Sequence, residues 1–299
     1  MLDFPEYTRL LYLVNENIEG FLPEVEVNSA SLAESMSYSL KAGGKRVRPV
    51  LLLAACELAG GDSSEAVPYA CAIEYIHTYS LIHDDLPALD DDDTRRGAPS
   101  NHKAYGEAAA ILAGDGLLSS AFETMHRDML MYFDKPDKLK RRARAAYEIS
   151  AACGCRGMIA GQVADIEAEN IDVSSELLEY IQVNKTAALI RAAVVAGGYI
   201  GGADATLIDS LRAYGESLGL AFQIADDILD VAGDEVEMGK PTGNDAARRK
   251  ATYPSVHGMD ESRNRLSGLT REAIERITSY DRNADFFTEI ARALSVRVC

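Results

Sequence analysis

Two clusters of aspartate in the 299-residue sequence could bind a divalent cation. The first cluster, residues 83–93 (HDDLPALDDDD), follows an apolar run. The second, residues 222–230 (FQIADDILD), lies within the most regular helical pattern of the chain. Mg²⁺ prefers carboxylate oxygens together with water and phosphate oxygens. The two clusters therefore predict a magnesium site that also holds a phosphorylated substrate.

The spacing within the second cluster explains why a cation is expected. Gln223, Asp226 and Asp230 are separated by three and four residues, so they share one face of a helix. Like charges at this spacing repel each other by roughly a few tenths of a kcal/mol. Transition metals are disfavoured because neither cluster contains several His or Cys ligands. For the first cluster alone, a solvated acidic turn is the ordinary alternative.

Basic residues occur in short groups that could bind a diphosphate. Arginine binds phosphate through two parallel hydrogen bonds, and lysine acts as a mobile point charge. A single group of this kind is common on protein surfaces, whereas several groups beside two acidic clusters are more specific. No Walker-type loop (GxxxxGK[ST]) occurs, so nucleoside triphosphate chemistry is not indicated. The basic groups contain Lys45 and Arg48 beside a glycine pair, Arg95 and Arg96, Lys185 and Arg191, and Lys240 and Lys250.

The composition of the chain limits its partners. Hydrophobic residues make up 47% and charged residues 26%, which is typical of a globular protein. The net charge of −17 disfavours nucleic acid as a partner. Five scattered cysteines do not form a disulfide framework. With no secretory leader and no apolar run of membrane-spanning length, we expect a cytoplasmic protein without a membrane span.

The elements that must position these residues are predicted to be helices. Apolar residues recur at helical spacing, and alternating β-branched runs typical of strands are absent. We therefore predict one all-α domain over residues 1–299. A polar loop over residues 233–254 follows the second cluster and is predicted to close over the site, with an ordinary surface loop as the alternative. The helical patterns cover residues 69–82, 107–132, 140–164, 174–199, 205–231 and, more weakly, 261–298.

Five segments together resemble a known family. GGKRVRP, LIHDDLPALDDDDTRRG, NKTAALIRAA, GLAFQIADDILD and GKPTGNDAARRKATYP are similar, in order, to the signature blocks of trans-prenyl diphosphate synthases. They cover residues 43–254, and the resemblance is closest to bacterial farnesyl diphosphate synthases. It implies a homodimer with the isoprenoid synthase fold, an all-α bundle around a central active-site cavity. It also implies magnesium-dependent condensation of isopentenyl diphosphate with dimethylallyl or geranyl diphosphate.

The resemblance also implies a role for each matching residue. Three Mg²⁺ ions would bind at Asp84, Asp90 and Asp226, with support from Asp85, Asp227 and Asp230. The allylic diphosphate would contact Arg95, Lys185, Gln223 and Lys240. The diphosphate of isopentenyl diphosphate would contact Lys45, Arg48, His77 and Arg96. Thr186 would line the reacting centre, and Lys250 would belong to the closing loop.

The product length is expected to depend on Tyr79 and Ser80, which lie five and four residues before Asp84. Five helical residues span about 7.5 Å, so the Tyr79 ring would stand below the first metal-binding cluster. By resemblance, a bulky ring there forms the floor of the prenyl pocket, which predicts the C15 product farnesyl diphosphate. The alternatives are a C10 or C20 product, and an ordinary core role for Tyr79.

Three other classes of protein share parts of this pattern. A terpene cyclase also uses aspartate-rich helices, but it does not need the second diphosphate site at residues 43–49. An HD-type phosphohydrolase could use His83 and Asp84, but only five histidines are present to complete its metal site. A non-catalytic scaffold subunit tends to lose one aspartate cluster, whereas this chain retains both.

Overall fold

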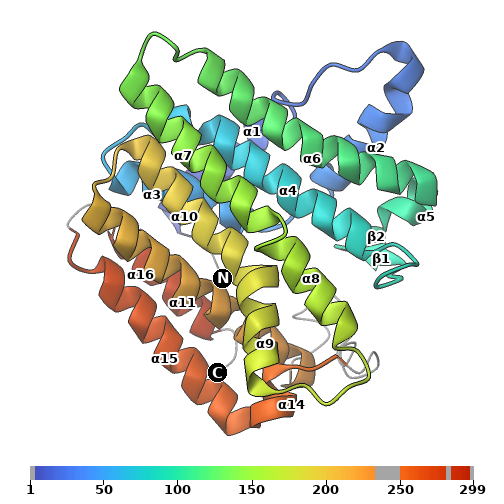
Figure 1. Cartoon of the computed structure of the whole chain (residues 1–299), viewed down its shortest axis with the longest axis vertical. Coiled ribbons are helices and arrows are strands. Elements are labelled where there is room, and N and C mark those ends of the chain that lie inside the picture. The colour runs from blue at the N-terminus through green and yellow to red at the C-terminus, as the bar shows by residue number, and fades with distance from the viewer. Residues whose placement is uncertain (1–3, 233–249, 281–283, 297–299) are drawn as a thin grey trace.

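Helix α10 (Ala188–Gly201) lies at the centre of the bundle in the computed structural model (Figure 1). Almost all of its residues are buried, and it packs against α3, α7 and α11. A helix that is apolar on all sides is expected to be buried in this way. Gly197 permits the closest approach, because a Cβ there would lie 2.0 Å from the carbonyl oxygen of Leu52.

The structure describes residues 4–232, 250–280 and 284–296. Within these ranges the helices from the N-terminal half are α1 (Pro5–Asn17), η1 (Val27–Ser29), α2 (Ala30–Lys41), α3 (Val47–Leu58), η2 (Ser63–Ala66), α4 (Val67–Asp84), α5 (Asn101–Tyr105) and α6 (Glu107–Leu130). Those that follow are α7 (Pro136–Cys153), α8 (Met158–Glu167), α9 (Ser175–Ile181), the π-helical segment η3 (Gln182–Ala187), α10, α11 (Ala205–Ala232), α14 (Tyr253–His257), α15 (Met259–Ile277) and α16 (Ala284–Val296).

Strands are confined, within the described residues, to one short antiparallel hairpin. It consists of β1 (Thr94–Arg95) and β2 (Ala98–Pro99), which pair directly after the first aspartate cluster. The prediction of an all-α bundle is therefore confirmed, whereas the boundaries of a single domain over residues 1–299 stay a prediction. Among the described residues, no helix combines the length and the apolar character needed to cross a membrane.

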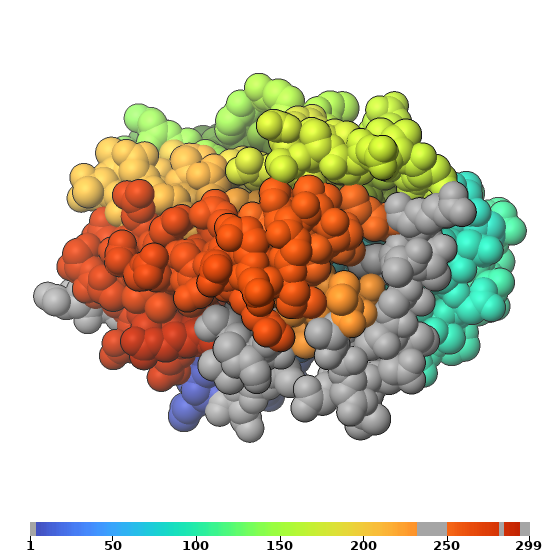
Figure 2. Space-filling view, turned by 90° about the horizontal axis from the view of Figure 1, so that it is seen from below, coloured from blue at the N-terminus to red at the C-terminus, as the bar shows by residue number. Residues whose placement is uncertain are grey.

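The helices that carry the two aspartate clusters lie on different sides of α10 (Figure 1). Helix α4 packs against α3 and α6, whereas α11 packs against α10 and α15. Helices α15 and α16 pack against α11, and their orange and red residues form much of the face seen in Figure 2, with the teal residues that follow α4 at one end of the molecule. This arrangement leaves the ends of α4 and α11 to frame a site at the same end of the bundle.

The helix boundaries differ from the sequence-based expectation at glycines and caps. The pattern over residues 140–164 is divided into α7 and α8, because Gly154 adopts an extended backbone and Gly157 another non-helical conformation between them. Of the predicted loop, residues 233–249 lie outside the described residues. The expectation of a loop extending to Pro254 is wrong at its end. Thr252 forms a capping box with Ser255, and proline is well suited to the first turn of a helix, so α14 already begins at Tyr253.

Candidate active site

The end of α4 brings two aspartates of the first cluster together. The chain turns back after α4, and the backbone amide of Asp90 donates to the carbonyl oxygen of Asp84 at 2.7 Å. Burial raises the pKa of Asp84 to about 6, with a further upward contribution from the charge of Asp90, whereas three nearby cations lower it, Lys185 most strongly. A buried carboxyl group with a second carboxylate beside it is a favourable position for a divalent cation.

The four consecutive aspartates that follow Leu89 have different partners. Asp90 pairs with Lys250 Nζ at 2.6 Å, on the side that faces the site. Asp92 lies 3.2 Å from the guanidinium of Arg95, and Asp93 pairs with Lys103 at 2.7 Å on the outer surface. Asp91 and Asp93 also lie near His102, where ligand atoms of the three residues fall within 4.8 Å of one another. The acidic run is therefore divided between the site and the surface.

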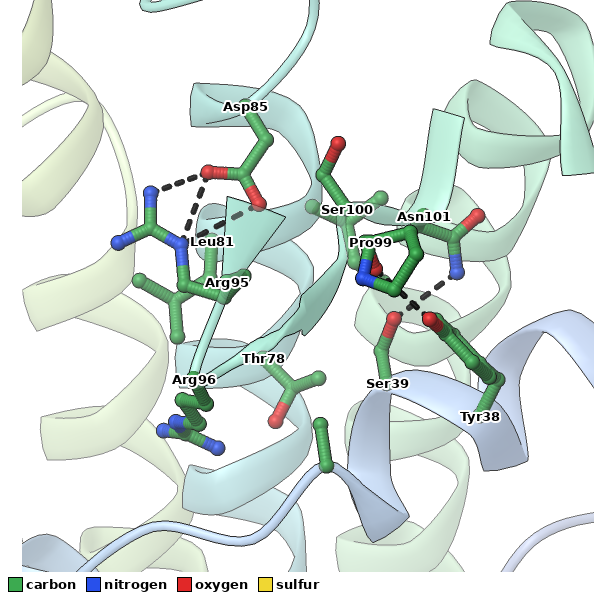
Figure 3. A pocket seen from close by; sticks show the side chains of 12 residues that line it. Tyr38, Ser39, Thr78, Leu81, Asp85, Arg95, Arg96, Pro99, Ser100 and Asn101 are labelled. Atoms are coloured by element: carbon green, nitrogen blue, oxygen red, sulfur yellow. Dashed lines mark hydrogen bonds and ion pairs between the residues drawn. The ribbon is translucent and has the colours of Figure 1, made fainter. Parts of the chain in front are cut away.

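The β1–β2 hairpin directs two consecutive arginines to different places. Arg95 Nε donates to Asp85 Oδ1 at 2.9 Å, so Asp85 is held by an arginine at the end of α4 (Figure 3). Arg96 and Gly97 form the turn with positive φ angles of 54° and 79°, typical of a tight hairpin. Arg96 then points toward the segment that joins α2 and α3, where it donates to the carbonyl of Gly43 (Figure 3).

The second cluster is tied to its neighbours through Asp227. This buried carboxylate accepts hydrogen bonds from the side-chain amides of Gln182 at 2.9 Å and Gln223 at 2.8 Å, and from the backbone amide of Tyr253 at 2.8 Å. Gln223 Oε1 in turn accepts from the Thr186 hydroxyl at 2.7 Å. Asp227 therefore connects α11 to η3 and α14. Asp226, on the same turn of α11, is half-buried.

Two lysines from distant parts of the chain meet at Asp165 on α8. Lys185 Nζ lies 2.7 Å from Asp165 Oδ2, and Lys250 Nζ lies 3.5 Å from the same oxygen. Sequence reasoning missed Asp165. The signal that could have found it is the Gln162–Asp165 spacing on an apolar helix, which repeats the Gln223–Asp226 spacing of the second cluster.

The π-helical segment η3 carries Lys185 and Thr186. Such segments are rare and occur frequently at functional sites, because they displace side chains from the regular helical register. Helix α8 approaches η3 closely at Gly161, where a Cβ would lie 2.2 Å from the backbone nitrogen of Lys185. A glycine is therefore required there for α8 to place Asp165 beside Lys185.

Arginines from two of the basic groups, Arg48 and Arg96, lie near His77, which is seven residues before Asp84 on α4. Burial lowers the pKa of His77 well below its ordinary value, and the charges of Arg48 and Arg96 lower it further. The ring is therefore neutral among cations. Lys45 lies in the same segment as Arg48, and its carbonyl oxygen accepts a hydrogen bond from the Tyr7 hydroxyl.

Tyr79 lies in the interior beside α6 and α7. Its side chain is 6% exposed, and its ring packs edge-to-face on His83 with centroids 5.7 Å apart. His83 contacts the carbonyl oxygen of Ile111 on α6 at 3.0 Å. Ser80 is half-buried and donates to the carbonyl of His77 at 2.9 Å.

The structure therefore brings most of the predicted site residues to one end of the bundle. Asp84, Asp90, Lys185 and Lys250 are linked through ion pairs and nearby charges. Arg48 lies within the electrostatic influence of Asp226, which connects the basic groups to the second cluster. Lys240 lies outside the described residues.

Comparison with known proteins gives consistent matches over most of the chain. The polyprenyl synthetase family model matches residues 29–289. The chloroplastic heterodimeric geranylgeranyl pyrophosphate synthase large subunit 1 of Arabidopsis thaliana is 47% identical over 272 residues, covering 90% of this chain and 72% of that protein. The farnesyl diphosphate synthase of Bacillus subtilis is 43% identical over 267 residues, covering 89% of each chain.

A solved structure extends the match to three dimensions. The apo structure of an FPP/GFPP synthase from Zymomonas mobilis has a TM-score of 0.84 at 34% identity and covers 97% of both chains. The matched residues include both aspartate clusters and the basic groups around His77. The chain belongs to the polyprenyl synthetase family and is a prenyltransferase with trans-prenyl diphosphate synthase activity.

Proposed function

We propose that this protein is a farnesyl diphosphate synthase, which condenses isopentenyl diphosphate with dimethylallyl and then geranyl diphosphate. The observation that carries the C15 product is the buried ring of Tyr79, five residues before Asp84. A prenyl chain that extends from the aspartates along α4 would meet this ring after about 7.5 Å of helix. Ser80 on the next position is small, so Tyr79 supplies the bulk.

The metal ligands in this proposal are Asp84, Asp90 and Asp226. The donor set fits Mg²⁺, the metal that prenyl synthases use, because it consists of carboxylate oxygens and leaves room for diphosphate oxygens. The proximity of Asp84 and Asp90 supports the assignment. When bound, three magnesium ions would neutralise the charge that develops on the departing pyrophosphate.

The cationic residues around these aspartates would hold the allylic diphosphate. Lys185 and Lys250 are oriented by Asp165, and Arg95 by Asp85. These cations would stabilise the pyrophosphate as the C–O bond breaks and leaves an allylic carbocation. Gln223 is proposed to contact the same diphosphate, and Thr186, its hydrogen-bond partner, would line the reacting centre. Lys240 is included by resemblance.

The second diphosphate would bind at Lys45, Arg48, His77 and Arg96. This position would bring the double bond of isopentenyl diphosphate to the carbocation. The new carbon–carbon bond forms, and the released pyrophosphate takes the proton that is then lost. Neutral His77 can donate one hydrogen bond to a phosphate oxygen without adding charge to the arginine cluster. The charge complementarity of this group supports the assignment.

A C20 product is the second candidate. The observation that favours it is the similarity to the plant geranylgeranyl pyrophosphate synthases, at 47% identity for the Arabidopsis protein. A C10 product would require a pocket floor that lies closer to the first aspartate cluster than Tyr79 does. These three outcomes differ in how far the pocket extends along α4, and they are distinguished by product length alone.

The test is a product assay on the purified full-length protein. It would be incubated with Mg²⁺, isopentenyl diphosphate and either dimethylallyl or geranyl diphosphate, and the dephosphorylated alcohols would be separated. We expect farnesol as the dominant product from both allylic substrates. A dominant C20 alcohol would retain the enzyme class and overturn the role of Tyr79 as the floor.

The oligomeric state and location also belong to this proposal. The exposed side chains of Ile159, Val163 and Ile166 recur along one side of α8, and they support association with a second copy. Light scattering on the purified protein should give twice the chain mass of 32.4 kDa. A monomer mass would contradict the homodimer. The cytoplasmic location stays a prediction.

A further inference from the structure

Glu74 is a buried carboxylate on α4 that sequence reasoning did not select. It is 1% exposed, and its Oε1 forms an ion pair at 2.7 Å with Arg46, which is itself only 5% exposed. A buried ion pair is not an efficient source of stability, since desolvation offsets much of the attraction. The pair therefore requires an explanation beyond the packing of α3 against α4.

Arg46 determines the path of the segment that contains Lys45 and Arg48. It adopts a left-handed backbone conformation with φ 50° and ψ 37°, which is unusual for a residue other than glycine. Its guanidinium also donates to the carbonyl oxygen of Leu40 at the end of α2. Glu74 thus fixes the side chain of the residue at which the α2–α3 connection enters α3.

The same connection is held against Arg96. The Arg96 guanidinium lies so close to Gly44 that a Cβ there would be 2.6 Å from its Cζ, and it donates to the carbonyl of Gly43 (Figure 3). The position of the Arg96 side chain therefore depends on the path of residues 43–46. Glu74 controls that path from the other side through Arg46.

Glu74 also acts as a counter-charge within the arginine cluster. Burial lowers the pKa of Arg48 and of Arg96, and in both cases Glu74 is the carboxylate with the largest opposing effect. Among the described residues, Glu74 Oε2 and Arg48 Nε are buried without hydrogen-bond partners. Glu74 lies three residues before His77, so it is on the face of α4 that the cations surround.

We propose that Glu74 is a positioning residue for isopentenyl diphosphate. Its carboxylate holds Arg46, and through it the α2–α3 connection, and it supplies a counter-charge to Arg48 and Arg96 before the diphosphate binds. This inference rests on the proposed assignment of the basic cluster to isopentenyl diphosphate. Glu74 does not contact the substrate in this account.

The first test is Glu74→Gln, which preserves shape and removes the charge. We expect the KM for isopentenyl diphosphate to rise about tenfold or more, since a charged group contributes on this order to the orientation of its partners. The KM for geranyl diphosphate should change by less than about twofold, which is too small a change to assign to a specific interaction. Equal changes in both KM values, or no change in either, would overturn the proposal.

A matched control separates positioning from folding. Asp128 on α6 forms a comparable buried pair with Arg142, at 2.8 Å, near the start of α4. Asp128→Asn should also lower the melting temperature, because it removes one of the two carboxylates, Asp128 and Glu65, that pair with the buried Arg142. It should leave the ratio of the two KM values unchanged. A changed ratio in the control would assign the effect to general destabilisation.

A double variant covers the case in which Glu74→Gln does not fold. Replacing both Arg46 and Glu74 with Met removes the pair together, and such replacements are often neutral for stability. The KM for isopentenyl diphosphate should still be raised, because Arg48 and Arg96 lack their counter-charge. A wild-type KM in the folded double variant would contradict the inference. If the wild-type protein itself makes no prenyl product, the proposed function fails instead.

Discussion

The site has an acidic half, around Asp84, Asp90 and Asp226, and a basic half, around Lys45, Arg48, His77 and Arg96. The two halves differ in the charge of the ligand that each is suited to bind. In the acidic half, Asp84 lies close to Asp90, and Lys185 and Lys250 lie nearby. Burial raises the pKa of Asp84. In the basic half, burial lowers the pKa of His77, and the surrounding arginines lower it further. The first half is suited to further cations and the second to an anion, before either substrate is considered.

Both halves are organised by α4. His77 and Asp84 lie seven residues apart, which is two helical turns or about 10 Å along the axis. One helix therefore fixes the separation between the two proposed diphosphate sites. The difference between the halves shows how two substrates with the same head group could be distinguished, since only one of them would bind through metal.

The largest effect is expected from the acidic half. Asp84→Asn should reduce kcat by about 10³-fold or more, because a lost metal ligand removes several kcal/mol of charge stabilisation. Asp93→Asn is the matched control, since Asp93 pairs with Lys103 on the surface. Steady-state rates at saturating substrate and Mg²⁺ would measure both. Equal losses in the two variants would contradict the division of the aspartate run.

The basic half should respond in substrate affinity. Arg96→Met is expected to raise the KM for isopentenyl diphosphate by roughly 10- to 100-fold, the range for a lost hydrogen bond to a charged group. The KM for the allylic substrate should change much less. Arg127→Met is the control, because this arginine forms an exposed pair with Glu123 on α6. Steady-state kinetics with each substrate varied in turn would measure both KM values. Equal increases in the two KM values would contradict the assignment of Arg96 to isopentenyl diphosphate.

The carboxylate of Asp165, which pairs with two lysines of the acidic half, should have a moderate effect. Asp165→Asn is expected to lower kcat about tenfold, since residues that orient a site contribute on this scale. Lys185 and Lys250 would lose a shared carboxylate, while the basic half would be untouched. Single-turnover measurements with geranyl diphosphate would detect the change. A selective rise in the KM for isopentenyl diphosphate would place Asp165 in the other half.

The smallest effect on rate should accompany a change of product. Tyr79→Ala is expected to shift the main product from C15 to C20, because the next ring on that side of α4, Tyr75, lies one turn or about 6 Å deeper. Tyr69→Ala makes a similar cavity near the start of α4 and should retain the C15 product. Chromatography of the prenyl alcohols would report the lengths. An unchanged product from Tyr79→Ala would show that the floor is elsewhere.

Much of the fold could be predicted from local patterns. The helix at residues 205–231 was predicted almost to its observed end, because its apolar residues keep a helical period. The division between α7 and α8 was missed, since the apolar pattern continues across Gly154 and Gly157. A periodic pattern reports which residues are buried and does not report whether the backbone is continuous.

The site was predicted less completely, because its contacts join distant segments. Asp165 and Glu74 lie outside the two aspartate clusters, in largely apolar helices, and their partners lie 20 or more residues away in the sequence. Asp227 was expected to support the metal ions, and its hydrogen bonds to Gln182, Gln223 and the Tyr253 amide are an additional structural role. Helical spacing separates Asp226 from Asp227, but it does not reveal which residues of other helices each one contacts.

The most direct test of the two-halves account is the binding of each substrate with and without metal. Isothermal titration calorimetry would compare geranyl diphosphate and isopentenyl diphosphate, each added to the wild-type protein in Mg²⁺ or in EDTA. The account predicts that EDTA abolishes binding of geranyl diphosphate and leaves that of isopentenyl diphosphate nearly unchanged. Equal dependence of both substrates on Mg²⁺, or metal-independent binding of geranyl diphosphate, would contradict it.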